Sequence, residues 1–90
     1  MTDKKIALVT KQGCPYCKRA KSILNQDLNG KYNDQIDLVE QETDAGRFRQ
    51  LQDQYQFQTV PTFIDQENGE ILSASQEDAI TQFLKEHLAG

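Results

Sequence analysis

Two cysteines separated by two residues, Cys14 and Cys17, are the side chains of this sequence best suited to chemistry. They are the only cysteines in the chain, and they lie in the stretch KQGCPYCKRA, residues 11–20. A close cysteine pair can be a redox-active dithiol, part of a metal site or a structural disulfide. The rest of the sequence has to distinguish between these uses.

Metal binding and a structural disulfide are the two alternatives to redox chemistry. Zinc takes about four ligands, usually Cys and His, and the chain adds only His87, which we expect at the surface near the end of a helix. A metal or iron–sulfur cluster shared between two chains remains open. A disulfide between Cys14 and Cys17 would close a very short loop and stabilise the fold little. Redox chemistry is therefore favoured.

The composition is that of one small, polar, acidic domain, which we expect to span residues 1–90 as a monomer. Hydrophobic residues make up 37% and charged residues 27%, and the net charge is −4. This charge disfavours nucleic acid and membrane surfaces as partners. The apolar run in MTDKKIALVT is too short for a signal peptide or a membrane span. We therefore expect a cytoplasmic protein, in a compartment where stable disulfides are uncommon.

Basic residues gather around the cysteines in the sequence. No acidic residue lies between Asp3 and Asp27. This interval contains six of the ten basic residues of the chain, which are Lys4, Lys5, Lys11, Lys18, Arg19 and Lys21. The pattern predicts a basic patch that includes the two cysteines.

The first half of the chain predicts a strand, a helix and a second strand. The apolar run KIALVT, residues 5–10, indicates a buried strand, and QIDLVE, residues 35–40, a second one. Between them, apolar residues at helical spacing predict a helix that ends at Asn29–Gly30, since both residues tolerate left-handed geometry. The apolar face of this helix consists of Cys17, Ala20, Ile23, Leu24 and Leu28.

The second half predicts a helix, a hairpin and a final helix. Phe48, Leu51 and Tyr55 share one helical face, although glutamines alternate from residue 50 to 58 and mimic a strand. TVPTFID, residues 59–65, and ILS, residues 71–73, flank an Asn-Gly pair, which indicates a hairpin. Ser75 begins a capping-box pattern for an amphipathic helix that contains residues 80–88. The order β-α-β-α-β-β-α predicts an α/β fold with a four-stranded mixed sheet and three flanking helices.

This order places Cys14 at the first turn of a helix, directly after a strand. Pro15 suits an early helical position, because it has no N–H to lose there. Unpaired backbone N–H groups and the positive end of the helix dipole stabilise a thiolate at such a place. Cys17 lies one turn further in and is less exposed. Cys14 is thus the expected nucleophile and Cys17 the expected resolving thiol.

Two motifs give the sequence a family resemblance. Residues 14–17 read CPYC, and Thr59-Val60-Pro61 reads TVP. With these motifs in this order of elements, the chain resembles the dithiol glutaredoxins, and the resemblance to the thioredoxin fold covers essentially the whole chain. It implies glutathione as co-substrate and no tightly bound cofactor. The residues that it assigns to glutathione are Lys11, Tyr16, Thr59, Val60, Pro61, Ser75 and Gln76.

The resemblance also implies individual roles. Lys11 would pair with a carboxylate of glutathione, and Tyr16 would pack beside the tripeptide. Pro61 would follow a cis peptide bond and face the cysteines, and the backbone of Val60 would pair with the cysteinyl unit as strands do. One part departs from the family pattern: residues 71–76, ILSASQ, lack the usual glycine pair, and Gln76 stands where aspartate is common. Glutamine cannot offer the γ-glutamyl amine an ionic contact.

The leading hypothesis is a glutathione-dependent thiol–disulfide oxidoreductase. It would reduce protein disulfides and glutathionylated proteins through Cys14 and Cys17. One alternative is a thioredoxin-like electron donor that is recharged by a flavoenzyme reductase, which the altered residues 72–76 would allow. Another is a dimer that binds an iron–sulfur cluster through Cys14 of each chain and glutathione.

Overall fold

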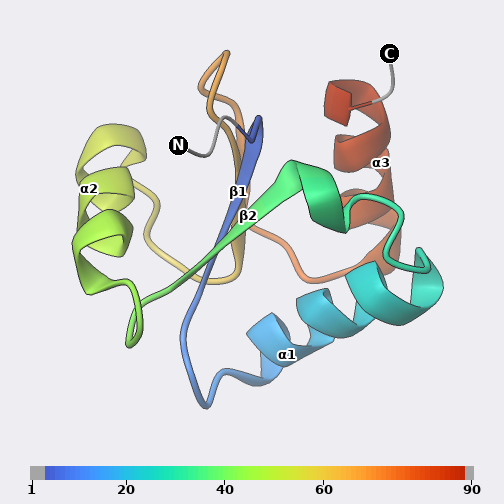
Figure 1. Ribbon diagram of the computed structural model, residues 1–90, viewed down its shortest axis with the longest axis horizontal. Coiled ribbons are helices and arrows are strands. Elements are labelled where there is room, and N and C mark those ends of the chain that lie inside the picture. The colour runs from blue at the N-terminus through green and yellow to red at the C-terminus, as the bar shows by residue number, and fades with distance from the viewer. Residues whose placement is uncertain (1–3, 89–90) are drawn as a thin grey trace.

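A four-stranded sheet covered by helices on both faces forms the core of the molecule (Figure 1). The computed structural model describes residues 4–88. Its strands and helices follow the predicted order: β1 (Ile6–Thr10), α1 (Pro15–Ser22), η1 (Ile23–Asp27), η2 (Asn33–Gln35), β2 (Ile36–Glu40), α2 (Ala45–Tyr55), β3 (Thr62–Asp65), β4 (Ile71–Leu72) and α3 (Glu77–Leu88).

The sheet is mixed, as the sequence predicts, with the strand order β2-β1-β3-β4. β1 runs parallel to β2, with Ile6 opposite Ile36, and antiparallel to β3. β3 and β4 form an antiparallel pair around Asn68–Gly69. Gly69 has a φ of +83°, a conformation that glycine adopts without strain. The hairpin prediction is therefore confirmed.

The two faces of the sheet carry separate apolar cores. All five residues of β1 are buried, which explains the unbroken apolar run of its first four residues, because a strand covered on both faces has no polar side. Ile6 and Leu8 point towards α1 and α3, whereas Ala7 and Val9 point towards α2. In Figure 1, α2 lies on one side of the sheet and α1 and α3 on the other.

The first helix ends where the sequence predicts but changes its geometry on the way. After Ser22 the helix continues as a π-helix, in which the N–H of Leu28 donates to the carbonyl of Ile23 at 2.9 Å. Asn29 and Gly30 then have φ angles of 54° and 69°. A single regular helix to residue 28 was therefore the wrong prediction, while the left-handed termination is confirmed.

The second helix confirms the helical interpretation of the glutamine-rich stretch. α2 begins after Asp44 and buries Phe48 and Leu51. It ends at Gln56, whose φ of 56° is left-handed. The stretch with alternating glutamines is therefore mostly helical and contains no strand.

The third helix begins later than its capping pattern predicts. Its first residue is Glu77, so Ser75 lies two residues before the helix and does not cap it. The backbone carbonyl of Ser75 instead accepts a hydrogen bond from Nε of Arg19 at 3.1 Å. This bond ties the loop before α3 to α1.

His87 lies in a charged cluster, and the prediction of a surface residue was wrong. Its side chain is 9% exposed and stacks on Phe83, with ring centroids 4.2 Å apart. Nδ1 lies 2.5 Å from the carboxylate of Asp65, which is fully buried, and Nε2 lies 3.2 Å from that of Glu70. Lys5 approaches Asp65 at 3.8 Å. The cluster joins α3 to the β3–β4 hairpin at the end of the sheet away from Cys14.

Candidate active site

Cys14 lies at the N-cap of α1, in the loop that follows β1. It has an extended backbone, and Pro15 opens the helix after it. Its Sγ accepts the backbone N–H of Cys17 at 3.2 Å. The thiol of Cys14 is half-buried, whereas Cys17 is 1% exposed. The side chain of Cys14 thus serves as the cap of its own helix, which is the position where a thiolate is stabilised.

The pKa values of the two thiols are shifted in opposite directions. Burial raises the pKa of Cys14, but the hydrogen bonds from Cys17 and from the N–H of Tyr16, together with the charge of Lys11, outweigh it and bring the pKa below its ordinary value. Burial raises the pKa of Cys17 to about 11, and its hydrogen bond with Cys14 adds to this rise. Since the thiolate is the nucleophile, Cys14 is the better nucleophile of the two, and Cys17 is protonated at neutral pH.

This difference predicts the pH dependence of alkylation. The thiolate fraction of Cys14 rises as the pH passes through its pKa, so reaction with iodoacetamide should have its midpoint below that of an ordinary cysteine. Cys17 should stay unmodified at pH 7. Mass spectrometry of the reduced, folded protein over a pH series measures both. Cys14→Ser should remove the fast reaction, and a midpoint at or above the ordinary value would contradict the assignment.

The loop before β3 faces the cysteines. The thiol of Cys14 donates to the carbonyl of Val60 at 3.9 Å, and the peptide bond between Val60 and Pro61 is cis, as the resemblance implies. Beneath this loop, the buried hydroxyl of Thr62 donates to the carbonyl of Thr59 at 2.6 Å and lies 3.0 Å from Oγ of Ser73. The hydroxyl pair therefore fixes the loop that carries Val60.

Removing this hydroxyl should destabilise the fold and the loop together. Thr62→Val removes the partner of the carbonyl of Thr59 and of the hydroxyl of Ser73, at a cost of about 0.5–1.5 kcal/mol for each hydrogen bond. Thr62→Ser keeps the bonds and loses one methyl, which costs about 0.8 kcal/mol. Urea unfolding of both variants measures the difference. A valine variant as stable as the serine variant would show that the hydroxyl does not hold the loop.

A hollow of about 350 Å³ lies beside Cys14 and gathers most of the residues that the resemblance assigns to glutathione. Its lining consists of Tyr16, Thr59, Val60, Pro61, Ser73, Ala74 and Ser75. Tyr16 forms its open wall and is 63% exposed. Lys11 lies on an adjoining small hollow of about 90 Å³ that also borders on Thr59 and Val60.

Two residues of this hollow have no assignment from the sequence, and two assigned residues, Lys11 and Gln76, do not line it. Ser73 and Ala74 follow β4 directly. The end of the predicted hairpin could have indicated them, since residues that follow an edge strand lie at the rim of a sheet. Gln76 is exposed and does not line the hollow. Gln76 therefore lies outside this lining, although it directly follows Ser75 in the chain.

The predicted basic patch is split by β1. Lys5 lies next to Asp65, and the carbonyl of Lys4 accepts a bond from Gln66 at the same end of the sheet. Only the basic residues after β1, which are Lys11, Lys18, Arg19 and Lys21, surround the first turn of α1. The prediction of one patch with six basic residues was therefore wrong.

Metal sites and membrane-spanning helices are two further features considered for residues 4–88. Within this range no three His, Cys, Asp or Glu side chains converge on a possible metal position. No described helix is both long enough and apolar enough to cross a membrane.

The sequence of the chain matches the model of one protein family. The model described as Glutaredoxin matches residues 6–68, which is more than half of the sequence. The chain belongs to the glutaredoxin family. The match includes both cysteines, the TVP segment and the hairpin turn, so the family assignment rests on the part of the fold that forms the site.

Solved structures with similar folds include both glutaredoxins and thioredoxins. Oxidized glutaredoxin 2 from Chlamydomonas reinhardtii is 30% identical, with a TM-score of 0.58 over 96% of this chain and 84% of that one. The thioredoxin-like protein BC3987 is 25% identical, with a TM-score of 0.67 over 89% of this chain and 100% of its own.

Thioredoxin f2 from the same alga has a TM-score of 0.69 at 15% identity, over 94% of this chain and 79% of that one, which shows the fold alone. The thioredoxin fold is thereby confirmed. No curated protein sequence matches the chain.

Family, fold and geometry agree on the chemistry. The protein is a thiol–disulfide oxidoreductase with Cys14 and Cys17 in the arrangement of a dithiol glutaredoxin. Glutaredoxins generally use glutathione as co-substrate and bind no cofactor tightly, and their partners are glutathione and protein disulfides.

Proposed function

We propose that this glutaredoxin reduces protein disulfides and glutathione mixed disulfides with glutathione as its reductant. One observation carries the proposal: Cys14 caps α1, accepts the N–H of Cys17, and contacts the carbonyl of Val60, which lines a hollow of about 350 Å³ beside it. The proposal includes a monomeric cytoplasmic protein, since a reducing compartment keeps the dithiol available.

The reaction follows from the two proton affinities. The thiolate of Cys14 attacks one sulfur of the substrate disulfide, and the other sulfur leaves as a thiolate and takes up a proton. Cys17 then loses its proton and attacks Sγ of Cys14, which releases the second substrate thiol and forms the Cys14–Cys17 disulfide. Two electrons have passed to the substrate. Two molecules of glutathione return them and leave as glutathione disulfide.

In this proposal glutathione occupies the hollow beside Cys14. Its cysteinyl unit pairs with the backbone of Val60, as one strand pairs with another. Lys11 attracts a carboxylate at one end of the tripeptide. Tyr16 packs against it, and Ser75 lies at the other end. Gln76 does not line the hollow but directly follows Ser75, so we place it near the γ-glutamyl end of the tripeptide.

Turnover of a glutathione mixed disulfide, with glutathione as the sole reductant, tests the proposal. We expect activity at millimolar glutathione. Its absence would reject the proposal and favour the thioredoxin-like alternative, in which a flavoenzyme reductase recharges the protein. The exposed Gln76 at the place of a common aspartate is the observation that keeps this alternative in view. Recycling of the oxidised protein by thioredoxin reductase is the parallel measurement.

Gln76→Asp should improve the use of glutathione. An aspartate there offers an ionic contact to the γ-glutamyl amine, and an exposed contact of this kind is worth up to about 1 kcal/mol. We expect the KM for the glutathione mixed disulfide to fall about 2- to 5-fold, with kcat little changed. Gln50→Asp, which makes the same charge change on the exposed side of α2, should leave KM unchanged. An equal fall in both variants would rule out a local contact.

A further inference from the structure

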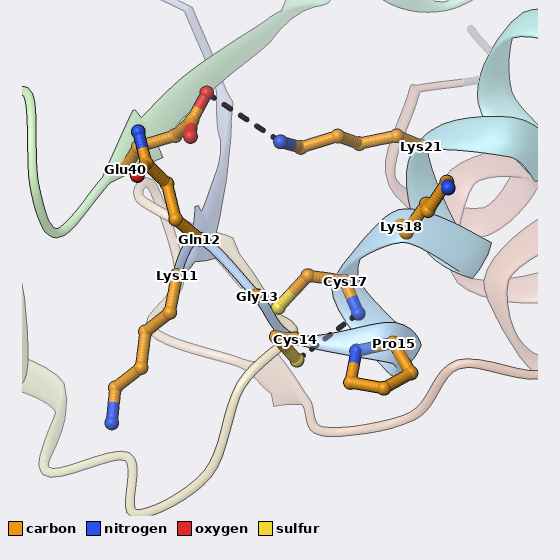
Figure 2. A pocket seen from close by; sticks show the side chains of 9 residues that line it. All are labelled: Lys11, Gln12, Gly13, Cys14, Pro15, Cys17, Lys18, Lys21 and Glu40. Carbon is orange, nitrogen blue, oxygen red and sulfur yellow. Dashed lines mark hydrogen bonds and ion pairs between the residues drawn. The ribbon is translucent and has the colours of Figure 1, made fainter.

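A second hollow, of about 510 Å³, borders on the cysteines and shares no lining residue with the one that contains Tyr16 and Val60 (Figure 2). Cys14 and Cys17 form part of its wall, and the stretch between β1 and α1 forms another part. The basic side chains that line it are Lys11, Lys18 and Lys21, and Glu40 at the end of β2 is its one acidic side chain. Of the residues that line this hollow, the proposed position of glutathione engages only Lys11.

The charge of the hollow is positive once its internal pair is counted. Lys21 and Glu40 lie 3.5 Å apart and are both partly buried, so their charges offset each other. Lys18 remains within the hollow, whereas the side chain of Lys11 points away from Lys18 and Lys21 in Figure 2. Within residues 4–88 neither Lys11 nor Lys18 pairs with a carboxylate. Glu42 lies at the rim, where its carboxylate accepts the backbone N–H of Gln12 at 2.9 Å.

The positive surface continues around the first turn of α1. Lys18 also lines a neighbouring hollow of about 440 Å³ together with Tyr16 and Arg19. Around Cys14 there are therefore four basic side chains and two acidic ones. The basic ones are Lys11, Lys18, Arg19 and Lys21, and the acidic ones are Glu40 and Glu42. The chain as a whole has a net charge of −4, so this surface stands out against an acidic protein. Such a contrast steers an acidic partner towards the cysteines.

A protein disulfide presents more chain to this surface than glutathione does. In the mixed disulfide, a partner cysteine is bonded to Sγ of Cys14, and the residues next to it continue past the site on both sides. An extended chain advances about 3.3 Å per residue. Side chains one to three residues from the partner cysteine are therefore within reach of a hollow whose wall includes Cys14 itself.

We propose that this hollow, beside Cys14 and lined by Lys18 and Lys21, receives an aspartate or glutamate of the partner protein, one to three residues from the target cysteine. The site then prefers disulfides with acidic flanks over neutral and basic ones. This inference rests on the proposed reduction of protein disulfides and adds the class of substrate. The acidic side chain only binds there, and the electrons follow the route through Cys14 and Cys17.

Single-turnover reduction of matched peptides tests the preference without glutathione. Three peptides of equal length, each closed by one disulfide, carry Asp, Asn or Lys on both sides of the cysteines. The reduced protein should release thiols from the Asp peptide about 10-fold faster than from the Lys peptide at low ionic strength, with the Asn peptide between them. The difference should shrink strongly at about 0.5 M NaCl, because salt screens exposed charges.

Two charge reversals locate the effect. Lys18→Glu should remove the preference or invert it. Lys85→Glu makes the same change at an exposed position of α3 and should retain the preference. Each result is a ratio between peptides for one protein, so a change in the reactivity of Cys14 cancels. Iodoacetamide, which is uncharged, measures that reactivity separately.

Each outcome has one interpretation. Equal rates for the three peptides in the wild-type protein overturn the inference and leave the proposed function standing. A preference that survives Lys18→Glu, or that Lys85→Glu removes equally, overturns the assignment to this hollow. Failure to reduce any peptide, while Cys14 still reacts with iodoacetamide, overturns the reduction of protein disulfides as well. A preference that Lys18→Glu alone abolishes supports the inference.

Discussion

Cys17→Ser is expected to abolish the reduction of protein disulfides while the reduction of glutathione mixed disulfides continues. Release of a protein thiol from the mixed disulfide on Cys14 requires a second thiol. Cys17 supplies it from one helical turn away, and such intramolecular groups act with effective concentrations of about 10⁵ M or more. A free thiol at millimolar concentration is a poor substitute. We expect a loss of at least about 100-fold on a protein disulfide.

The other activity should survive because the serine variant keeps the nucleophile. The N–H of residue 17 still donates to Sγ of Cys14, since this bond comes from the backbone. When glutathione is the group bound to Cys14, a second glutathione can resolve the intermediate without Cys17. Coupled assays with a glutathionylated peptide and with a protein disulfide measure the two activities side by side.

Two further results complete this test. Cys14→Ser should lose both activities, because of the two thiols only Cys14 has a lowered pKa and it is the one removed. If Cys17→Ser also loses both activities together, while Cys14 still reacts with iodoacetamide, glutathione does not resolve the intermediate in this protein. The thioredoxin-like alternative would then gain support.

The sequence predicts the chemistry of this protein well because the decisive residues are close together in it. The CPYC stretch, the strand before it and the proline after Cys14 are local signals, and local signals determine where a helix begins. The parallel pairing of β1 with β2 and the antiparallel hairpin also follow from short patterns. Each of these features is confirmed without any knowledge of distant contacts.

The features that the sequence did not predict depend on contacts between distant residues or on small backbone changes. Asp65 and His87 are 22 residues apart, and nothing in the local sequence of either indicates the other. The six basic residues form one interval in the sequence, but β1 separates Lys5 from Lys11 by a strand of five residues, roughly 16 Å. The π-helix shifts each hydrogen bond by one residue and leaves the apolar spacing almost unchanged.

Asp65→Ala should cost a large part of the stability of the fold. The carboxylate is fully buried, accepts the N–H groups of Glu67 at 2.9 Å and Asn68 at 3.3 Å, and faces His87. Hydrogen bonds to a charged group are worth about 1.5–3 kcal/mol each, and this substitution removes several of them. Domains of this size have unfolding free energies of about 5–15 kcal/mol. The variant should therefore unfold at much lower urea concentration than the wild-type protein.

The same cluster predicts how stability depends on pH. Burial raises the pKa of Asp65, but the N–H of Glu67, the ring of His87, the N–H of Asn68 and the charge of Lys5 together bring it below its ordinary value. A lowered pKa means that the folded state holds the ionised carboxylate more tightly than the unfolded state does. The resulting stability is present above about pH 4 and is lost as the pH falls through the folded pKa.

Asp65→Asn separates the charge from the hydrogen bonds. The amide keeps an oxygen for the two N–H groups but loses the charge, so the acid-sensitive part of the stability should shrink relative to the wild-type protein. Asp53→Asn, at an exposed position of α2, should change the unfolding free energy by no more than about 0.5 kcal/mol. Urea unfolding between pH 3 and pH 7 measures all three proteins, with those pH values set by the ordinary aspartate range.

The position of the cluster gives this prediction a second readout. Asp65 lies opposite Ile6 at the start of β1, whereas Cys14 follows the end of the same strand. Under conditions where the variants are folded, the alkylation rate of Cys14 should therefore match that of the wild-type protein. If Asp65→Asn changed that rate while the protein stayed folded, the cluster would be coupled to the active site through β1. The stability prediction has its own contrary outcome. If Asp65→Ala left the unfolding free energy unchanged, the ring of His87 and the hairpin would hold α3 without the carboxylate.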